Sequence, residues 1–192
     1  LQPGTHAGAE IGGLLGGGDT HVLNNVHRWF AEHLKGESGA MENQKPVNMK
    51  VKFTSGYQQY DAFPVPEAYE QTFYLQPRNL FSNGRLSDSP FQSWRAQDNS
   101  INSLFDTVAT TQVPLLSQIL EQLDVPVLAN MAHVARPHGI VFETSRQWST
   151  MQIRGNAELS LMVQPKSDTL HLVAYLYDVN LFGTGKLITH KP

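Results

Sequence analysis

Large apolar residues recur every three or four positions near the start of this 192-residue chain: Val22, Val26, Trp29, Phe30 and Leu34. Asp19 or Thr20 offers an N-cap oxygen before this run, and Gly36 offers a C-cap after it. Residues three and four apart lie on the same face of a helix. The pattern therefore predicts an amphipathic helix over residues 22–35.

The hydrophobic period changes after a polar stretch at residues 38–46, which we interpret as a linker. Residues 49–53 alternate between apolar and lysine side chains, a pattern typical of a half-buried strand. Further strands are expected at residues 70–76, 139–144, 151–157, 159–164, 170–179 and 186–190. Apolar residues at helical intervals predict one short helix over residues 113–123. Short strands separated by turn-forming residues favour a mainly-β sandwich.

This change of period predicts two domains. Residues 1–36, a glycine-rich loop and a helix, form the first, and residues 37–192 form the β-sandwich. Leu1 is not an initiator methionine, so we expect the chain to begin inside a longer polypeptide.

Charge and composition narrow the function. The charged fraction of 16% is below the ~25% of an average domain, which suits a β-rich chain. A net charge of -3 without a run of Lys or Arg argues against nucleic acid and membrane surfaces as partners. The absence of cysteine excludes thiol catalysis and disulfides. No apolar stretch approaches the ~20 residues that cross a bilayer, and the compartment stays unknown.

His6 is the candidate catalytic residue. It lies in the small-residue loop Pro-Gly-Thr-His-Ala-Gly at positions 3–8, before the predicted helix. A triad imidazole must reach its nucleophile, which a pliant loop allows, and in α/β-hydrolases the histidine comes last in chain order. No G-x-S-x-G turn occurs in the chain, so the serine and the acid would lie upstream. The alternative interpretation is an exposed loop histidine without a role in catalysis.

Two polar patterns look like ligand sites but lack the residues that such sites require. We therefore expect no cofactor and no metal. Residues 13–20 read G-x-x-x-x-G-D-T, but Asp19 stands where a phosphate loop has lysine. His21, His27 and His33 follow one another at six-residue steps, about 240° apart on a helix, and cannot share a zinc-binding face. We interpret them as surface or domain-contact residues.

Several aromatic residues gather in turn-rich sequence: Tyr57, Tyr60, Phe63, Tyr69 and Trp94. They would either line a substrate or sugar cleft or seal an edge of the sandwich. Sealing an edge of the sandwich or a domain interface is the favoured interpretation, and a ligand cleft is the alternative.

Two parts of the chain resemble a known family. Residues 3–8 together with His-Arg-Trp-Phe-Ala-Glu-His-Leu-Lys-Gly at 27–36 resemble the end of the catalytic domain of X-Pro dipeptidyl-peptidase and cocaine-esterase-like (CocE/NonD) α/β-hydrolases. Residues 49–53, 63–64, 72–75, 140–144, 153–155, 172–179 and 187–190 are similar to that family's C-terminal jelly roll. The order and spacing of the pieces carry the resemblance.

The resemblance implies a galactose-binding-like jelly-roll sandwich preceded by the last loop and helix of an α/β-hydrolase domain. It implies a serine hydrolase acting on a small ester, amide or X-Pro peptide, with His6 in the triad and an upstream hydrolase domain as partner. Family jelly rolls continue beyond the region where this chain stops, so the sandwich is expected to be incomplete. The alternative function is a non-catalytic module that binds carbohydrate or protein.

Overall fold

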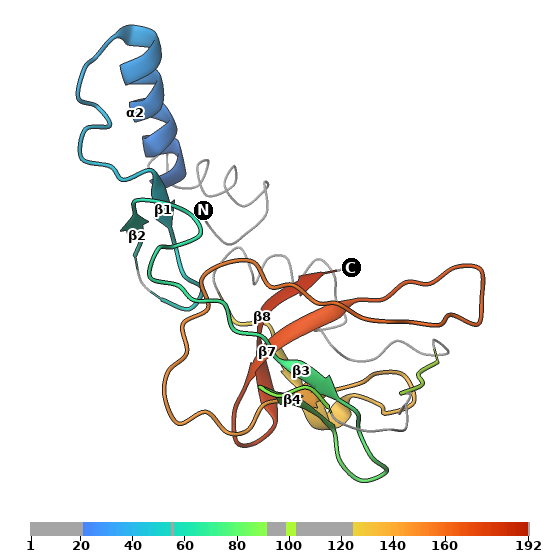
Figure 1. Ribbon diagram of the computed structural model, residues 1–192. Coiled ribbons are helices and arrows are strands. Elements are labelled where there is room, and N and C mark those ends of the chain that lie inside the picture. Colours follow the sequence, from blue (N-terminus) through green and yellow to red (C-terminus); the bar gives the residue numbers. More distant parts are fainter. Residues whose placement is uncertain (1–20, 55, 92–98, 103–124, 192) are drawn as a thin grey trace. The chain divides into compact units, whose positions relative to one another are not determined.

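The computed structural model describes residues 21–54, 56–91, 99–102 and 125–191 (Figure 1). The chain divides into two compact units. Unit 1 comprises Leu1–Pro66 and Val113–Val127, and unit 2 comprises Glu67–Gln112 and Leu128–Pro192. Each unit is described separately.

Unit 1 contains helix α2 (His21–Lys35) and a small antiparallel sheet of β1 (Val47–Met49) and β2 (Gln58–Tyr60). The helix ends at Gly36, whose φ of 72° lies in the left-handed region that glycine adopts without steric cost. Among the described residues of unit 1, Met49 on β1 is buried.

Unit 2 contains two three-stranded sheets. The first has the order β3-β4-β6, with β3 and β4 antiparallel and β4 and β6 parallel, and the second has the antiparallel order β5-β8-β7. The bounds are β3 Tyr74–Gln76, β4 Gly84–Ser87, β5 Leu128–Asn130, β6 Phe142–Glu143, β7 Ala174–Val179 and β8 Thr184–Lys191, and a 3-10 turn, η1, spans Met131–His133.

Each sheet of unit 2 has an identifiable packing centre. In the second sheet, Ala129 on β5 and Leu187 on the central strand β8 are buried. In the first sheet, Gly84 faces the ring of Phe142, and a Cβ at position 84 would lie 2.4 Å from Phe142 Cδ1. The parallel pairing of β4 with β6 therefore requires a residue without a side chain at position 84.

The helix expected at residues 22–35 is confirmed within one residue by α2. The mainly-β class is also confirmed, since the described residues form three sheets and one α-helix. The jelly-roll arrangement stays a prediction. The helix expected at residues 113–123 lies outside the described residues.

The strand expected at residues 49–53 is wrong in position. Strand β1 ends at Met49, and the chain then turns, with Phe53 at a φ of 63°. The N–H and hydroxyl of Thr54 both donate to the carbonyl of Val51, at 3.2 and 2.7 Å. This local turn competes with the strand that the alternation predicts.

The strands expected at residues 151–157 and 159–164 are wrong, because these described residues form no strand. Their alternating apolar side chains, among them Ile153, Leu161 and Val163, are about half-exposed. Alternating apolar and polar residues indicate that a segment could place one face on a sheet. A strand forms only where a neighbouring strand supplies the backbone hydrogen bonds.

The remaining strand predictions differ mainly in length. The expected strand at 186–190 lies within β8, and those at 70–76, 139–144 and 170–179 shrink to β3, β6 and β7. Strands β2, β4 and β5 were not predicted.

Candidate functional site

His6, the predicted catalytic residue, lies outside the described residues. The same holds for the glycine-rich residues 13–20 and for Trp94. The assignment of His6 to a triad therefore stays a prediction. The polar cluster described next lies at the first turn of α2.

His21 opens α2 and lies in a polar cluster of unit 1. Its Nε2 is 2.8 Å from Asn25 Nδ2, one helical turn away, and 3.1 Å from Asn48 Nδ2 on β1. The ring stacks on Tyr57, with centroids 3.5 Å apart and planes 18° from parallel. Gln44 Nε2 donates to Asn25 Oδ1 at 2.6 Å and links the segment before β1 to the helix. The cluster therefore ties the start of α2 to the small sheet.

The two amides define the protonation state of His21. Amide nitrogens donate hydrogen bonds, so Nε2 accepts from Asn25 and Asn48 and the ring is neutral with its proton on Nδ1. Burial lowers the pKa of His21 from its ordinary value of 6.5, and burial likewise raises the pKa of the Tyr57 phenol. The folded cluster thus favours a neutral imidazole stacked on a neutral phenol.

We expect Asn48→Asp to raise the pKa of His21, because a carboxylate accepts a hydrogen bond from protonated Nε2 and attracts its charge. In the unchanged protein, the fold has its full stability above pH 6.5, where the ring is neutral in both states, and it loses stability as the pH falls from 6.5 through the lowered pKa of the folded state. NMR titration of the His21 ring protons measures the pKa in both proteins, and urea unfolding at several pH values measures the stability. Asn43→Asp, which adds the same charge at an exposed position, is the control. An unchanged His21 titration in Asn48→Asp would contradict the hydrogen bond to Asn48.

The other histidines have separate surroundings. His27 is exposed on α2, and the ring of His33 lies 4.6 Å from the ring of Trp29. His138 Nδ1 is 3.0 Å from the carbonyl oxygen of Asn102. Within the described parts of the chain, no three residues of the kinds that ligate metals gather at one place.

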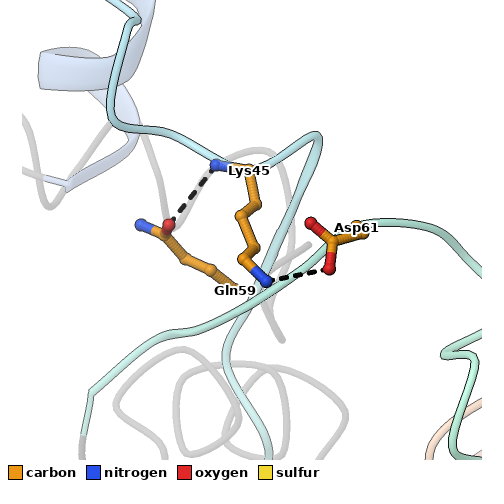
Figure 2. A network of polar contacts seen from close by, with 3 residues as sticks. All are labelled: Lys45, Gln59 and Asp61. Carbon is orange, nitrogen blue, oxygen red and sulfur yellow. Dashed lines mark hydrogen bonds and ion pairs between the residues drawn. The ribbon is translucent and has the colours of Figure 1, made fainter.

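Lys45 fastens the segment before β1 to strand β2 (Figure 2). Its N–H donates to Gln59 Oε1 at 3.3 Å, and its Nζ lies 2.9 Å from Asp61 Oδ2. Both charged side chains are exposed, and ion pairs of this kind contribute ~0–1 kcal/mol. These contacts hold the backbone before β1 against β2, and we assign them a structural role.

In unit 2, Arg78 and Arg136 each donate hydrogen bonds to backbone carbonyls in the segment that carries the other. These contacts were not predicted from the sequence. Arg78 Nη1 donates to the carbonyls of Arg136 and Gly139, at 2.6 and 3.1 Å. Arg136 Nη2 donates in return to the carbonyls of Asn79 and Ser82, at 2.5 and 3.1 Å. Hydrophobic periodicity carries no signal for such contacts, because both arginines lie between strands and bind backbone oxygens.

The aromatic residues grouped by sequence are divided between the two units. Tyr57 stacks on His21 in unit 1, whereas Tyr69 belongs to unit 2 and is strongly exposed. Trp148, which the sequence analysis did not single out, is also strongly exposed, with the guanidinium of Arg146 4.1 Å from its ring centroid.

The fold and the comparisons together define a class, a β-rich accessory domain of a hydrolase. A sequence model of the X-Pro dipeptidyl-peptidase C-terminal non-catalytic domain matches residues 38–190, most of the chain. The chain belongs to this family, and the resemblance found from the sequence is confirmed over residues 38–190. No curated protein matches the chain. None of the helices among the described residues has the length and apolar character needed to span a membrane.

Proposed function

We propose that this chain is the C-terminal portion of a serine hydrolase that cleaves a small ester, an amide or an X-Pro peptide. Residues 1–36 would be the end of the α/β-hydrolase catalytic domain, and residues 37–192 the accessory domain. The observation that carries the proposal is the match of residues 38–190 to the non-catalytic domain of X-Pro dipeptidyl-peptidases.

In this proposal His6 is the general base and then the general acid. Its imidazole removes the proton from the serine hydroxyl as the oxygen attacks the substrate carbonyl, and it returns that proton to the leaving amine or alcohol. The acyl-enzyme is then hydrolysed by water, with His6 repeating both transfers. The serine, the acid and the oxyanion-hole donors belong to the upstream partner domain.

The accessory domain contributes no member of the triad. Its proposed role is to cover an apolar face of the hydrolase domain and to form one wall of the substrate cleft, which limits the acyl groups or dipeptides that fit. The family's description as non-catalytic supports this division of labour.

Purified residues 1–192 are expected to show no serine-dependent turnover, because the proposed nucleophile lies upstream. The intact protein is expected to hydrolyse a p-nitrophenyl ester or an X-Pro p-nitroanilide and to be labelled on serine by a fluorophosphonate. Hydrolysis rates and mass spectrometry of the labelled proteins measure the difference. Serine labelling of residues 1–192 together with turnover would contradict the proposal, as would an intact protein that neither turns over nor reacts.

A further inference from the structure

Strand β4 begins at an Asn-Gly pair, Asn83 and Gly84, and the fold itself requires the glycine. A Cβ at position 84 would lie 2.4 Å from Phe142 Cδ1 and 2.9 Å from the backbone oxygen of Gln76. The strands on both sides of β4 therefore leave no space for a side chain directly after Asn83. A glycine in this place also removes the steric hindrance that protects most asparagine side chains from attack by the next backbone nitrogen.

An Asn-Gly pair reacts within its own chain, because the glycine nitrogen lies close to the asparagine side chain. The glycine nitrogen attacks Cγ, and the new bond closes a cyclic succinimide. The side-chain nitrogen leaves as ammonia and takes the proton that the glycine nitrogen loses. Water then opens the ring at either carbonyl, giving its hydroxyl to that carbon and a proton to the glycine nitrogen. The product is aspartate, or isoaspartate with the backbone running through Cγ.

Both nitrogens that take part in this reaction are held by the segment around β6. The Gly84 N–H donates to the carbonyl of Val141 at 2.9 Å, and Asn83 Nδ2 donates to Glu143 Oε1 at 2.7 Å. Attack on Cγ requires Gly84 to lose the proton that it donates to Val141, and the leaving amide must break its bond to Glu143. The pairing of β4 with β6 therefore opposes the reaction, and a local separation of these strands releases both nitrogens together.

The surroundings of Asn83 suit an amide better than a carboxylate. Residues two apart along a strand share a face, so Asn83, directly before β4, lies on the same side as Arg85. Glu143 is registered opposite Arg85, and Arg85 Nη2 donates to the Ser145 hydroxyl at 2.8 Å. An aspartate at position 83 would lose the donor to Glu143 and would place two carboxylates beside one guanidinium. Like charges facing one another across a sheet are destabilising.

Isoaspartate would change the backbone as well as the charge. It adds a carbon atom to the chain between positions 83 and 84, which displaces β4 relative to the residues it pairs with on both sides. Strand β4 is the central strand of its sheet, and Gly84 fits closely between Gln76 and Phe142. The displacement therefore disturbs the pairing with β3 and with β6.

We propose that Asn83 is a site of spontaneous deamidation controlled by the pairing of β4 with β6. The paired strands preserve the amide, separation of the strands starts its conversion, and the aspartate or isoaspartate that forms keeps β6 apart from β4. Water is the co-reactant and ammonia is the leaving group. The domain thereby acquires an irreversible chemical mark of strand opening, and this inference is independent of the proposed hydrolase function.

Trypsin allows a direct measurement, because it cleaves after Arg78 and Arg85 and releases residues 79–85 as one peptide. Residues 1–192 are incubated at mildly alkaline pH in buffer and in unfolding urea, and mass spectrometry follows the conversion of Asn83. We expect conversion at least ~10-fold slower in buffer, as for a site that reacts only after a local opening. A synthetic peptide of residues 79–85 is expected to react equally fast in both solutions, which excludes an effect of urea on the chemistry.

Two further measurements isolate the contribution of β6. Asn79 lies in the same tryptic peptide but precedes Leu80, whose side chain hinders attack, so it is expected to keep its amide. Glu143→Ala removes the acceptor of Asn83 Nδ2 and is expected to speed conversion at least ~3-fold in buffer, with no effect in urea. Equal rates for the folded and unfolded chain, or an unchanged rate in Glu143→Ala, would overturn the control by β6.

Asn83→Asp reproduces the aspartate product and tests its effect on the fold. Urea unfolding is expected to show an equilibrium constant for folding at least ~3-fold lower than in the unchanged chain. Adding Glu143→Gln is expected to restore most of this loss, because an amide at position 143 removes the repulsion and donates to the new carboxylate. Asn43→Asp, which adds the same charge at an exposed position, is the matched control. Equal stability of Asn83→Asp and Asn43→Asp would show that the product leaves β6 in place and would refute the proposal.

Discussion

His6→Ala in the intact protein is expected to lower kcat/KM for X-Pro amide or ester substrates by about 10⁴–10⁶-fold, the range that loss of a triad member produces in serine hydrolases. Without the imidazole, the serine hydroxyl keeps its proton and is a weak nucleophile. Steady-state hydrolysis of an X-Pro p-nitroanilide, with circular dichroism as the check on folding, measures the loss.

His27→Ala is the matched control, because His27 is an exposed histidine on α2 and no role in proton transfer is assigned to it. Its kcat/KM is expected to stay within about twofold of the unchanged protein. Near-normal turnover by His6→Ala would remove His6 from the mechanism while leaving the family assignment of residues 38–190 intact.

Leu187→Ala is expected to destabilise the chain by about 2–5 kcal/mol, the cost of emptying a buried leucine site. Leu187 is 3% exposed on β8, the central strand of its sheet, and it pairs with Tyr177 of β7. Burial raises the pKa of the neighbouring Tyr177 phenol to about 12. Urea unfolding of residues 1–192, followed by circular dichroism, measures the change.

Leu181→Ala provides the comparison for this experiment. Leu181 lies on the β7–β8 turn at 72% exposure, so its truncation is expected to change the free energy of unfolding by less than ~0.5 kcal/mol. Equal unfolding midpoints for the two variants would mean that Leu187 does not lie in the core of unit 2.

Local signals predicted the fold best. Helix α2 follows from the spacing of its apolar residues and from Gly36, both of which act within a few residues of chain. Strands depend on partners distant in sequence, which explains why residues 151–164 alternate like a strand and yet form none. Strand β4, which begins at Gly84, was not predicted, because its partners β3 and β6 include Phe142, a residue distant in sequence that the local pattern does not show.

The candidate site was predicted only in part. The resemblance found for the second half of the chain agrees with the family match, because the order of many strand-like pieces is specific even where each piece is weak. The prediction for His6 rests on a few loop residues outside the described parts of the chain. The hydrolysis assay of His6→Ala tests it. The His21 cluster was missed because Asn25, Asn48 and Tyr57 meet only after folding.

The close approach of Gly84 and Phe142 also limits how this domain can evolve. Because the aromatic ring occupies the space where a side chain at position 84 would begin, the two positions are matched in size. A substitution that enlarges position 84 is compatible with the β4–β6 pairing only after the ring at position 142 has been exchanged for something smaller. The backbone carbonyl of Gln76 on β3 would lie 2.9 Å from the same Cβ, so a smaller residue at position 142 does not by itself make room for a side chain, and both neighbouring strands hold position 84 to glycine.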